Sequence, residues 1–182
     1  MFFRSIKIKN FLSKKIKSKS NFVLISLLNK LIKSENQILL SMQKNYKVSY
    51  NKKLISNLKK YKNVNIIGMG GSVLGSKAIY NFLELKKKNF NFIDSFSKFS
   101  VKNNKEKKLN IIISKSGNTL ETISNSNILI SHNKNIFLTE NKKSYLVELA
   151  NKLKAEVISH NNYIGGRYSV LSEVGMLPAE LM

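Results

Sequence analysis

The sequence contains no cysteine, few acidic residues and no long apolar run. Without cysteine the chain cannot form a disulfide, present a thiolate nucleophile or bind a metal through sulfur, and a reducing compartment is compatible with it. The longest apolar run, residues 22–28, is interrupted by Ser26 and followed by Asn29, whereas a membrane-spanning helix needs about 20 apolar residues. We therefore expect a soluble, cytoplasmic protein.

The amino-terminal segment lacks the features of a secretory signal. Residues 1–20 hold seven basic side chains and no acidic one, but no continuous apolar region and no small-residue cleavage site. An organelle-targeting peptide is an alternative for this segment. Such peptides favour arginine, however, and the segment is nearly all lysine.

The scarcity of acidic residues gives the chain a strong positive charge. Thirty-two Lys and Arg stand against 10 Asp and Glu, so the formal net charge is +22. Such a charge favours binding to the phosphate backbones of nucleic acids, because binding releases counterions. Nucleic-acid binding is therefore an alternative function. Only Arg4 and Arg167 are arginines, however, although base and phosphate recognition favour the bidentate guanidinium. Lysine is spread along the whole chain, so we interpret it as solvated surface.

The length and the apolar content indicate one domain with an extension. The chain has 182 residues, of which 42% are hydrophobic, enough to bury a core. We expect a helical extension over residues 1–60, where apolar side chains at three- and four-residue spacing predict an amphipathic helix at residues 21–45. We expect its apolar stripe to pack in the core. A second short periodic stretch surrounds Leu54 and Leu58.

From residue 61 to residue 182 short apolar runs alternate with helical patterns. The predicted strands are residues 64–67, 90–93, 109–113, 136–138 and 156–158, and the predicted helices are residues 74–85, 119–131 and 144–153. This order predicts an α/β fold, a doubly wound parallel sheet flanked by helices, with residues 95–108 as a surface connection. Ligands bind such sheets beyond the carboxyl ends of the strands.

The first predicted strand is followed by a glycine-rich loop, Gly68-Met69-Gly70-Gly71-Ser72-Val73-Leu74-Gly75. A dinucleotide fingerprint would need glycine where Val73 stands, and a P-loop would need Gly-Lys-Ser or Gly-Lys-Thr. What remains is a tight turn in which Gly71 lets the backbone approach a ligand and Ser72 lies near the start of the next helix. A plain strand-to-helix turn is the alternative.

The third predicted strand is followed by a loop rich in hydroxyl groups. It reads Ser114-Lys115-Ser116-Gly117-Asn118-Thr119-Leu120-Glu121-Thr122. Three hydroxyls and a lysine surround the first turn of a helix whose free N–H groups favour an anion, and a further threonine lies on the same face. This set predicts a phosphate-monoester site that needs no metal: Ser114, Lys115, Ser116, Thr119 and Thr122. Ordinary capping and turn formation is the alternative.

A third cluster, Ile164-Gly165-Gly166-Arg167-Tyr168-Ser169, lies near the end of the sequence. Arginine after two glycines, in a chain that otherwise uses lysine, indicates a need for a planar guanidinium that recognises an anion or an enediolate. A surface arginine in a turn is the alternative. His132 and His160 lack metal-ligand spacing, but His160 precedes this cluster and could approach the site.

These three clusters, in this order, resemble the glucose-6-phosphate isomerase family over about residues 20–182. The resemblance implies a sugar-isomerase (SIS) domain with a flavodoxin-like sandwich and an isomerase of glycolysis and gluconeogenesis. The family interconverts glucose 6-phosphate and fructose 6-phosphate through a cis-enediol, without metal or cofactor. By resemblance, the hydroxyl-rich loop binds the phosphate, Gly71 and Ser72 line the sugar, and Arg167 stabilises the enediolate.

The sequence departs from the family because the motifs of the catalytic glutamate and of the ring-opening histidine and lysine are missing. Neither Glu121 nor Glu173 lies in the base motif. We therefore expect an amino-terminal fragment that binds phosphosugar with negligible turnover, and a homodimer in the full-length protein. A stand-alone SIS-domain module that senses sugar phosphates is the alternative, and phosphomannose isomerisation could use the same half-site.

Overall fold

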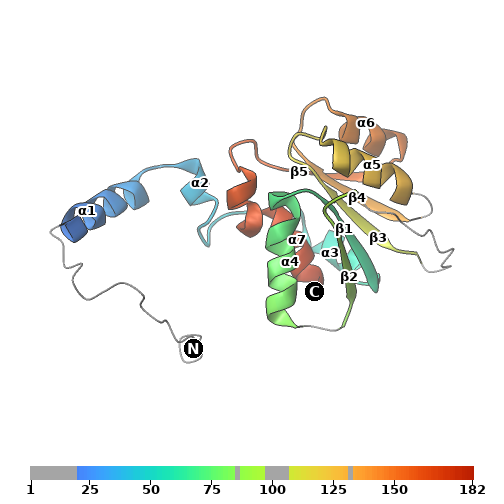
Figure 1. The fold of residues 1–182 in the computed structure, drawn as a ribbon, viewed down its shortest axis with the longest axis horizontal. Helices are drawn as coiled ribbons and strands as arrows, with labels where there is room; N and C mark the ends of the chain where they lie inside the picture. The colour runs from blue at the N-terminus through green and yellow to red at the C-terminus, as the bar shows by residue number, and fades with distance from the viewer. Residues whose placement is uncertain (1–19, 85–86, 97–106, 131–132) are drawn as a thin grey trace.

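A computed structural model of the chain describes residues 20–84, 87–96, 107–130 and 133–182 (Figure 1). Five strands form one parallel sheet in the order β2-β1-β3-β4-β5. They are β1 (Asn63–Gly68), β2 (Asn89–Ile93), β3 (Leu109–Ile113), β4 (Lys134–Thr139) and β5 (Glu156–Ser159). Each lies where the sequence predicts a strand, and the order is that of the flavodoxin-like doubly wound sheet.

Helices cover both faces of the sheet, which confirms the predicted α/β class (Figure 1). One face packs against α3 (Lys52–Leu58), α4 (Gly71–Leu83) and α7 (Glu173–Leu181), and the other against α5 (Leu120–Leu129) and α6 (Tyr145–Lys152). Neighbouring residues of β3 alternate between the two cores, since Ile111 belongs to the first and Ile112 to the second. All five residues of β3 are buried, as expected for a central parallel strand.

A row of asparagines crosses the sheet within its interior. Asn65, Asn110 and Asn135 stand in register on β1, β3 and β4. The Asn65 amide donates to the Asn110 side-chain oxygen at 2.8 Å, and the Asn110 amide donates to Asn135 at 2.9 Å. Asn110 also donates to the Leu129 carbonyl at the end of α5. These bonds satisfy polar groups that would otherwise be costly to bury.

The carboxyl-terminal region contains two elements for which the sequence analysis predicts no structure. A 3₁₀ helix, η1 (Gly166–Leu171), leads into α7, which begins at the capping residue Ser172. α7 includes Pro178 in its interior and contributes Val174, Leu177 and Leu181 to the first core. Apolar residues recur in this segment at helical spacing. Gly175 and Pro178 disfavour a helix, however, and for that reason the sequence analysis predicts none here.

The prediction of one amphipathic helix at residues 21–45 with a buried stripe is wrong. α1 spans Ser20–Lys33, and a separate short helix, α2 (Gln37–Leu40), begins where the Asn36 side chain accepts bonds from the Ile38 and Leu39 amides. The apolar side chains of α1 are exposed, from 49% at Leu31 to 81% at Phe22. α1 extends away from the sheet in Figure 1, in agreement with the exposure of these side chains.

One helix of the predicted 1–60 extension belongs to the main core. α3, inside the predicted 1–60 extension, packs into the first core through Leu54 and Leu58. The expectations for residues 1–19, for His132 and for most of the 95–108 connection fall outside the described residues. None of the helices in the described ranges is long and apolar enough to cross a bilayer.

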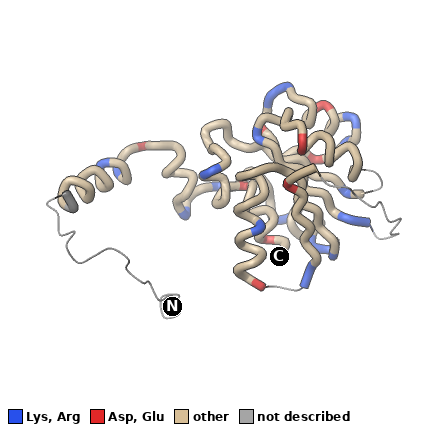
Figure 2. Tube along the Cα trace, viewed as in Figure 1, with Lys and Arg blue, Asp and Glu red and all other residues tan. Residues whose placement is uncertain are grey.

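Figure 2 shows Lys and Arg spread over the sheet with its helices and over the amino-terminal helices.

Candidate functional site

The glycine-rich loop and the hydroxyl-rich loop meet at one edge of the sheet. β1 and β3 are neighbours, and Gly68 at the end of β1 pairs with Ile113 at the end of β3. The chain order reverses between these strands, because β2 lies on the far side of β1 while β4 and β5 follow β3. Both loops therefore open at the topological switch point, where doubly wound sheets bind their ligands.

Three of the predicted phosphate-binding hydroxyls come together before the first turn of α5. The Ser114 and Thr119 hydroxyl oxygens are 2.9 Å apart, and Ser116 lies 3.5 Å from each of them. Thr119 is the N-cap residue of α5, but its side chain caps no backbone N–H. The hydroxyls are thus gathered beside the positive end of a helix, an arrangement that suits an anion.

The shape of this loop depends on Gly117. Its φ of +69° is in the left-handed region, and an added Cβ would lie 2.2 Å from the Ser144 hydroxyl. The loop is tied to the start of α6 because the Leu146 amide donates to the Gly117 carbonyl and the Tyr145 amide donates to the Asn118 side chain. These bonds hold the hydroxyls in place before any ligand arrives.

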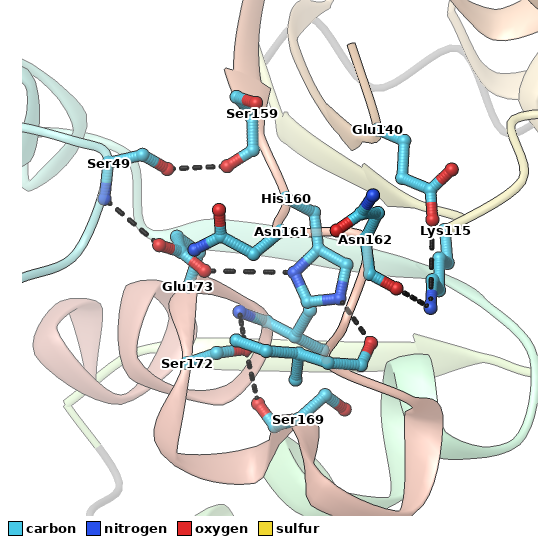
Figure 3. A network of polar contacts seen from close by, with 12 residues as sticks. Ser49, Lys115, Glu140, Ser159, His160, Asn161, Asn162, Ser169, Ser172 and Glu173 are labelled. Carbon is cyan, nitrogen blue, oxygen red and sulfur yellow. Dashed lines mark hydrogen bonds and ion pairs between the residues drawn. The ribbon is translucent and has the colours of Figure 1, made fainter. Parts of the chain in front are cut away.

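The structure gives Lys115 a set of protein partners. Its ammonium group donates to the Asn162 carbonyl at 2.5 Å and lies 3.6 Å from the Glu140 carboxylate (Figure 3). The hydrogen bond from Lys142 lowers the pKa of Glu140, burial opposes this, and the charges of Lys142 and Lys115 lower it further. Lys115 therefore joins the hydroxyl-rich loop to the segment that precedes Gly165.

Thr122, the last predicted phosphate ligand, lies in the first turn of α5. Its side chain is 1% exposed, and its hydroxyl has no hydrogen-bond partner among the described residues. Neither Ser114, Ser116 nor Thr119 makes a hydrogen bond to it within that part of the chain.

The Gly-Gly-Arg segment packs directly against the glycine-rich loop. A Cβ on Gly71 would lie 2.3 Å from the Gly166 carbonyl oxygen, so only glycine permits this approach. The Ser169 hydroxyl donates to the Gly71 carbonyl at 3.2 Å. An open cavity of about 680 Å³ lies between the two segments. It is lined by Gly71, Leu74, Gly75, Gly165, Gly166, Arg167, Tyr168 and Val170.

The sequence analysis missed the partners that support these loops. Glu140 directly follows β4, so the rule of strand carboxyl ends could have identified it. Asn162 contributes only its backbone carbonyl, which no side-chain pattern reveals. His160 is buried, and its ring lies between the Ile164 carbonyl and Glu173 rather than in the cavity. Among the described residues, no group of three His, Asp or Glu side chains could hold a metal ion.

Comparisons with known proteins agree with the resemblance carried by the three clusters. The phosphoglucose isomerase family model matches residues 48–182. Glucose-6-phosphate isomerase of Methanocaldococcus jannaschii is 37% identical over 138 residues, which cover 65% of this chain and 32% of the relative. That of Borrelia garinii subsp. bavariensis is 39% identical, covering 65% of this chain and 26% of the relative. The chain thus spans about a third or less of these relatives.

A solved structure shows a similar fold. A hypothetical protein from Thermus thermophilus superimposes with a TM-score of 0.68 at 20% identity, covering 89% of this chain and 44% of that one. At this identity the likeness concerns the fold alone.

Proposed function

The chain belongs to the phosphoglucose isomerase family, and we propose that it supplies the phosphate-binding and enediolate-stabilising part of an aldose–ketose isomerase. The substrates proposed are glucose 6-phosphate and fructose 6-phosphate. One observation carries the proposal: three hydroxyls meet within 3.5 Å of one another beside the start of α5, at the switch point of the sheet.

In this proposal the phosphate sits against the hydroxyl-rich loop. Hydroxyl groups and helix N–H groups donate hydrogen bonds to phosphate oxygens without a metal. The phosphate ligands proposed are Ser114, Ser116 and Thr119, with Thr122 and the backbone of Lys115. The Lys115 ammonium has three N–H donors, of which the Asn162 carbonyl takes one, so it can also contribute.

The proposal places the reacting end of the sugar between the glycine-rich loop and Arg167. Gly71 and Ser72 line the sugar, and the Arg167 guanidinium is exposed beside the cavity that Gly71 shares with Gly166. As the proton moves between C1 and C2, negative charge develops on the enediolate oxygens. A preorganised donor at such an oxygen is worth roughly 10²–10³ in rate.

We propose none of the carboxylates among the described residues as the base that moves the proton between C1 and C2. Glu173 is fully buried and accepts bonds from Tyr46 and Ser49, so its oxygens are already committed. We accordingly propose that the purified chain binds phosphosugar with negligible turnover, because we assign no general base among the described residues. Conversion of fructose 6-phosphate by this chain would contradict that expectation.

The wider setting follows from the family. We propose a role in glycolysis and gluconeogenesis in the cytoplasm, and a homodimer of the whole protein. We also propose residues 61–182 as the SIS domain and residues 1–60 as its extension.

Calorimetric titration tests the proposed roles. The ligands are 6-phosphogluconate and a phosphosugar hydroxamate that mimics the enediolate, and the variants are Thr119→Ala and Arg167→Lys. Thr119→Ala should weaken both ligands by about tenfold or more, since it removes a hydrogen bond to a charged group. Arg167→Lys should weaken mainly the hydroxamate.

Thr119→Ser is the matched control for the first variant because it keeps the hydroxyl and removes only a methyl group. We expect it to bind both ligands nearly as the native chain does. Equal losses for Thr119→Ser and Thr119→Ala, or no loss for either, would contradict the phosphate assignment.

A further inference from the structure

A buried histidine–glutamate pair lies behind the Gly-Gly-Arg segment. His160 and Glu173 are 4% and 0% exposed, and the His160 Nδ1 atom lies 3.7 Å from a Glu173 carboxylate oxygen (Figure 3). His160 follows β5 and Glu173 begins α7, so the pair joins the two ends of the segment that carries Arg167.

The pair holds a backbone carbonyl of that segment. The His160 Nε2 atom lies 3.1 Å from the Ile164 carbonyl oxygen, directly before Gly165. The other ring nitrogen, Nδ1, faces the Glu173 carboxylate at 3.7 Å, beyond hydrogen-bond distance, and has no hydrogen-bond partner among the described residues. The same segment is held a second time, because Lys115 donates to the Asn162 carbonyl.

Glu173 is in turn fixed by the amino-terminal part of the chain. The Tyr46 hydroxyl donates to the two carboxylate oxygens at 2.8 and 3.0 Å, and the Ser49 amide donates at 3.0 Å. Burial raises the pKa of Glu173, but the interactions with His160, its own backbone N–H, Tyr46 and Ser49 outweigh burial and lower it. A buried carboxylate with these partners has a fixed orientation, and it lies beside the His160 ring.

We propose that His160 and Glu173 are positioning residues, which fix the Ile164–Gly166 backbone so that the Arg167 guanidinium faces the reacting end of a phosphosugar. This inference rests on the proposed function. Neither residue lines the cavity, and among the described residues neither side chain is hydrogen-bonded to the hydroxyl-rich loop, so we propose that the pair acts through the backbone that precedes Arg167. Misplacement of a catalytic group by about 1 Å can cost a hundredfold.

Two probes separate positioning of Arg167 from general stability. Inorganic phosphate, followed by NMR titration, needs only the hydroxyl-rich loop, whereas the enediolate-mimicking hydroxamate, followed by calorimetry, also needs Arg167. In the 182-residue chain, His160→Leu should weaken the hydroxamate by at least about tenfold and phosphate by less than about twofold. His160→Gln, whose amide N–H can reach the Ile164 carbonyl, should recover most of the loss.

A double-mutant cycle shows whether His160 acts through Arg167. In the His160→Leu background, Arg167→Lys should cost the hydroxamate much less than it does in the native chain, because the guanidinium is already misplaced. Asn110→Leu is the control, since it removes buried hydrogen bonds in the sheet but none near Arg167. It should lower the melting temperature and leave the ratio of the two affinities unchanged.

Tyr46→Phe is a second variant, which tests the same proposal if His160→Leu does not fold. It removes one donor to Glu173 and should weaken the hydroxamate selectively by about threefold. Additive effects of His160→Leu and Arg167→Lys, or an unchanged affinity ratio in Tyr46→Phe, would overturn the positioning role. A native chain whose hydroxamate affinity does not depend on Arg167 would instead overturn the proposed function.

Discussion

Replacement of Gly71 by alanine should separate the two segments that form the cavity. The new Cβ would lie 2.3 Å from the Gly166 carbonyl oxygen and 2.5 Å from its carbonyl carbon, whereas ordinary contact begins near 3.4 Å. Both atoms belong to backbone, so no side-chain rotation relieves the clash. The glycine-rich loop and the Gly-Gly-Arg segment must therefore move apart by about 1 Å.

This displacement should lower the free energy of unfolding, and it should lower the ligand affinity by more. Overpacking of this kind costs about 1–3 kcal/mol of unfolding free energy. The bond from the Ser169 hydroxyl to the Gly71 carbonyl, 3.2 Å long, would lengthen as well. Because Arg167 follows Gly166, we expect the affinity for the enediolate-mimicking hydroxamate to fall by about 10- to 100-fold.

Urea denaturation and calorimetric titration measure the two effects. Gly165→Ala is the control for stability, because its Cβ would meet only the Tyr168 ring at 3.9 Å and its φ of −76° suits alanine. Its free energy of unfolding should stay the same or rise by up to about 1 kcal/mol. Equal stability of Gly71→Ala and Gly165→Ala, or native hydroxamate affinity in Gly71→Ala, would refute the close approach.

Three further substitutions test other parts of the structure. Asn110→Leu leaves the partners of a fully buried amide unpaired, so urea denaturation should show a loss of about 2–5 kcal/mol, and a loss below about 1 kcal/mol would contradict the buried row. The folded-state pKa of Glu173 lies below its ordinary 4.5, so its charge stabilises the fold above that pH and this contribution is lost as pH falls through the folded-state value. Glu173→Gln should therefore make the loss of unfolding free energy less steep as the pH falls below about 4.5, and an unchanged acid dependence of stability would refute this reasoning. Gly117→Ala combines a left-handed φ with a clash against Ser144, so it should destabilise by about 2–4 kcal/mol and weaken every phosphate ligand, whereas native binding would contradict the loop's rigidity.

The sheet could be predicted because each strand is a short segment with neighbouring or alternating apolar residues, bounded by polar ones. β3, with three consecutive isoleucines, is an example, and its full burial follows from its central place. α1 shows the limit of the same method. Periodicity predicts which face of a helix is apolar, but it does not say what covers that face, and the bend at Asn36 depends on a local side-chain cap.

The gathering of hydroxyl groups at the candidate site could be predicted from residue types and their place in the chain, whereas their role as phosphate ligands stays a prediction. The meeting of Ser114, Ser116 and Thr119 follows from their place after a central strand. The contacts of Lys115 with Asn162 and of His160 with Ile164 could not be predicted, because both acceptors are backbone carbonyls of a loop. Their positions depend on how that loop folds, and no residue pattern encodes it.

A crystal structure of the 182-residue chain soaked with fructose 6-phosphate tests the central claim most directly. We predict phosphate density within hydrogen-bond distance of the Ser114, Ser116 and Thr119 hydroxyls at the start of α5. Phosphate bound at a surface lysine cluster, with these three hydroxyls unchanged and unliganded, would contradict it.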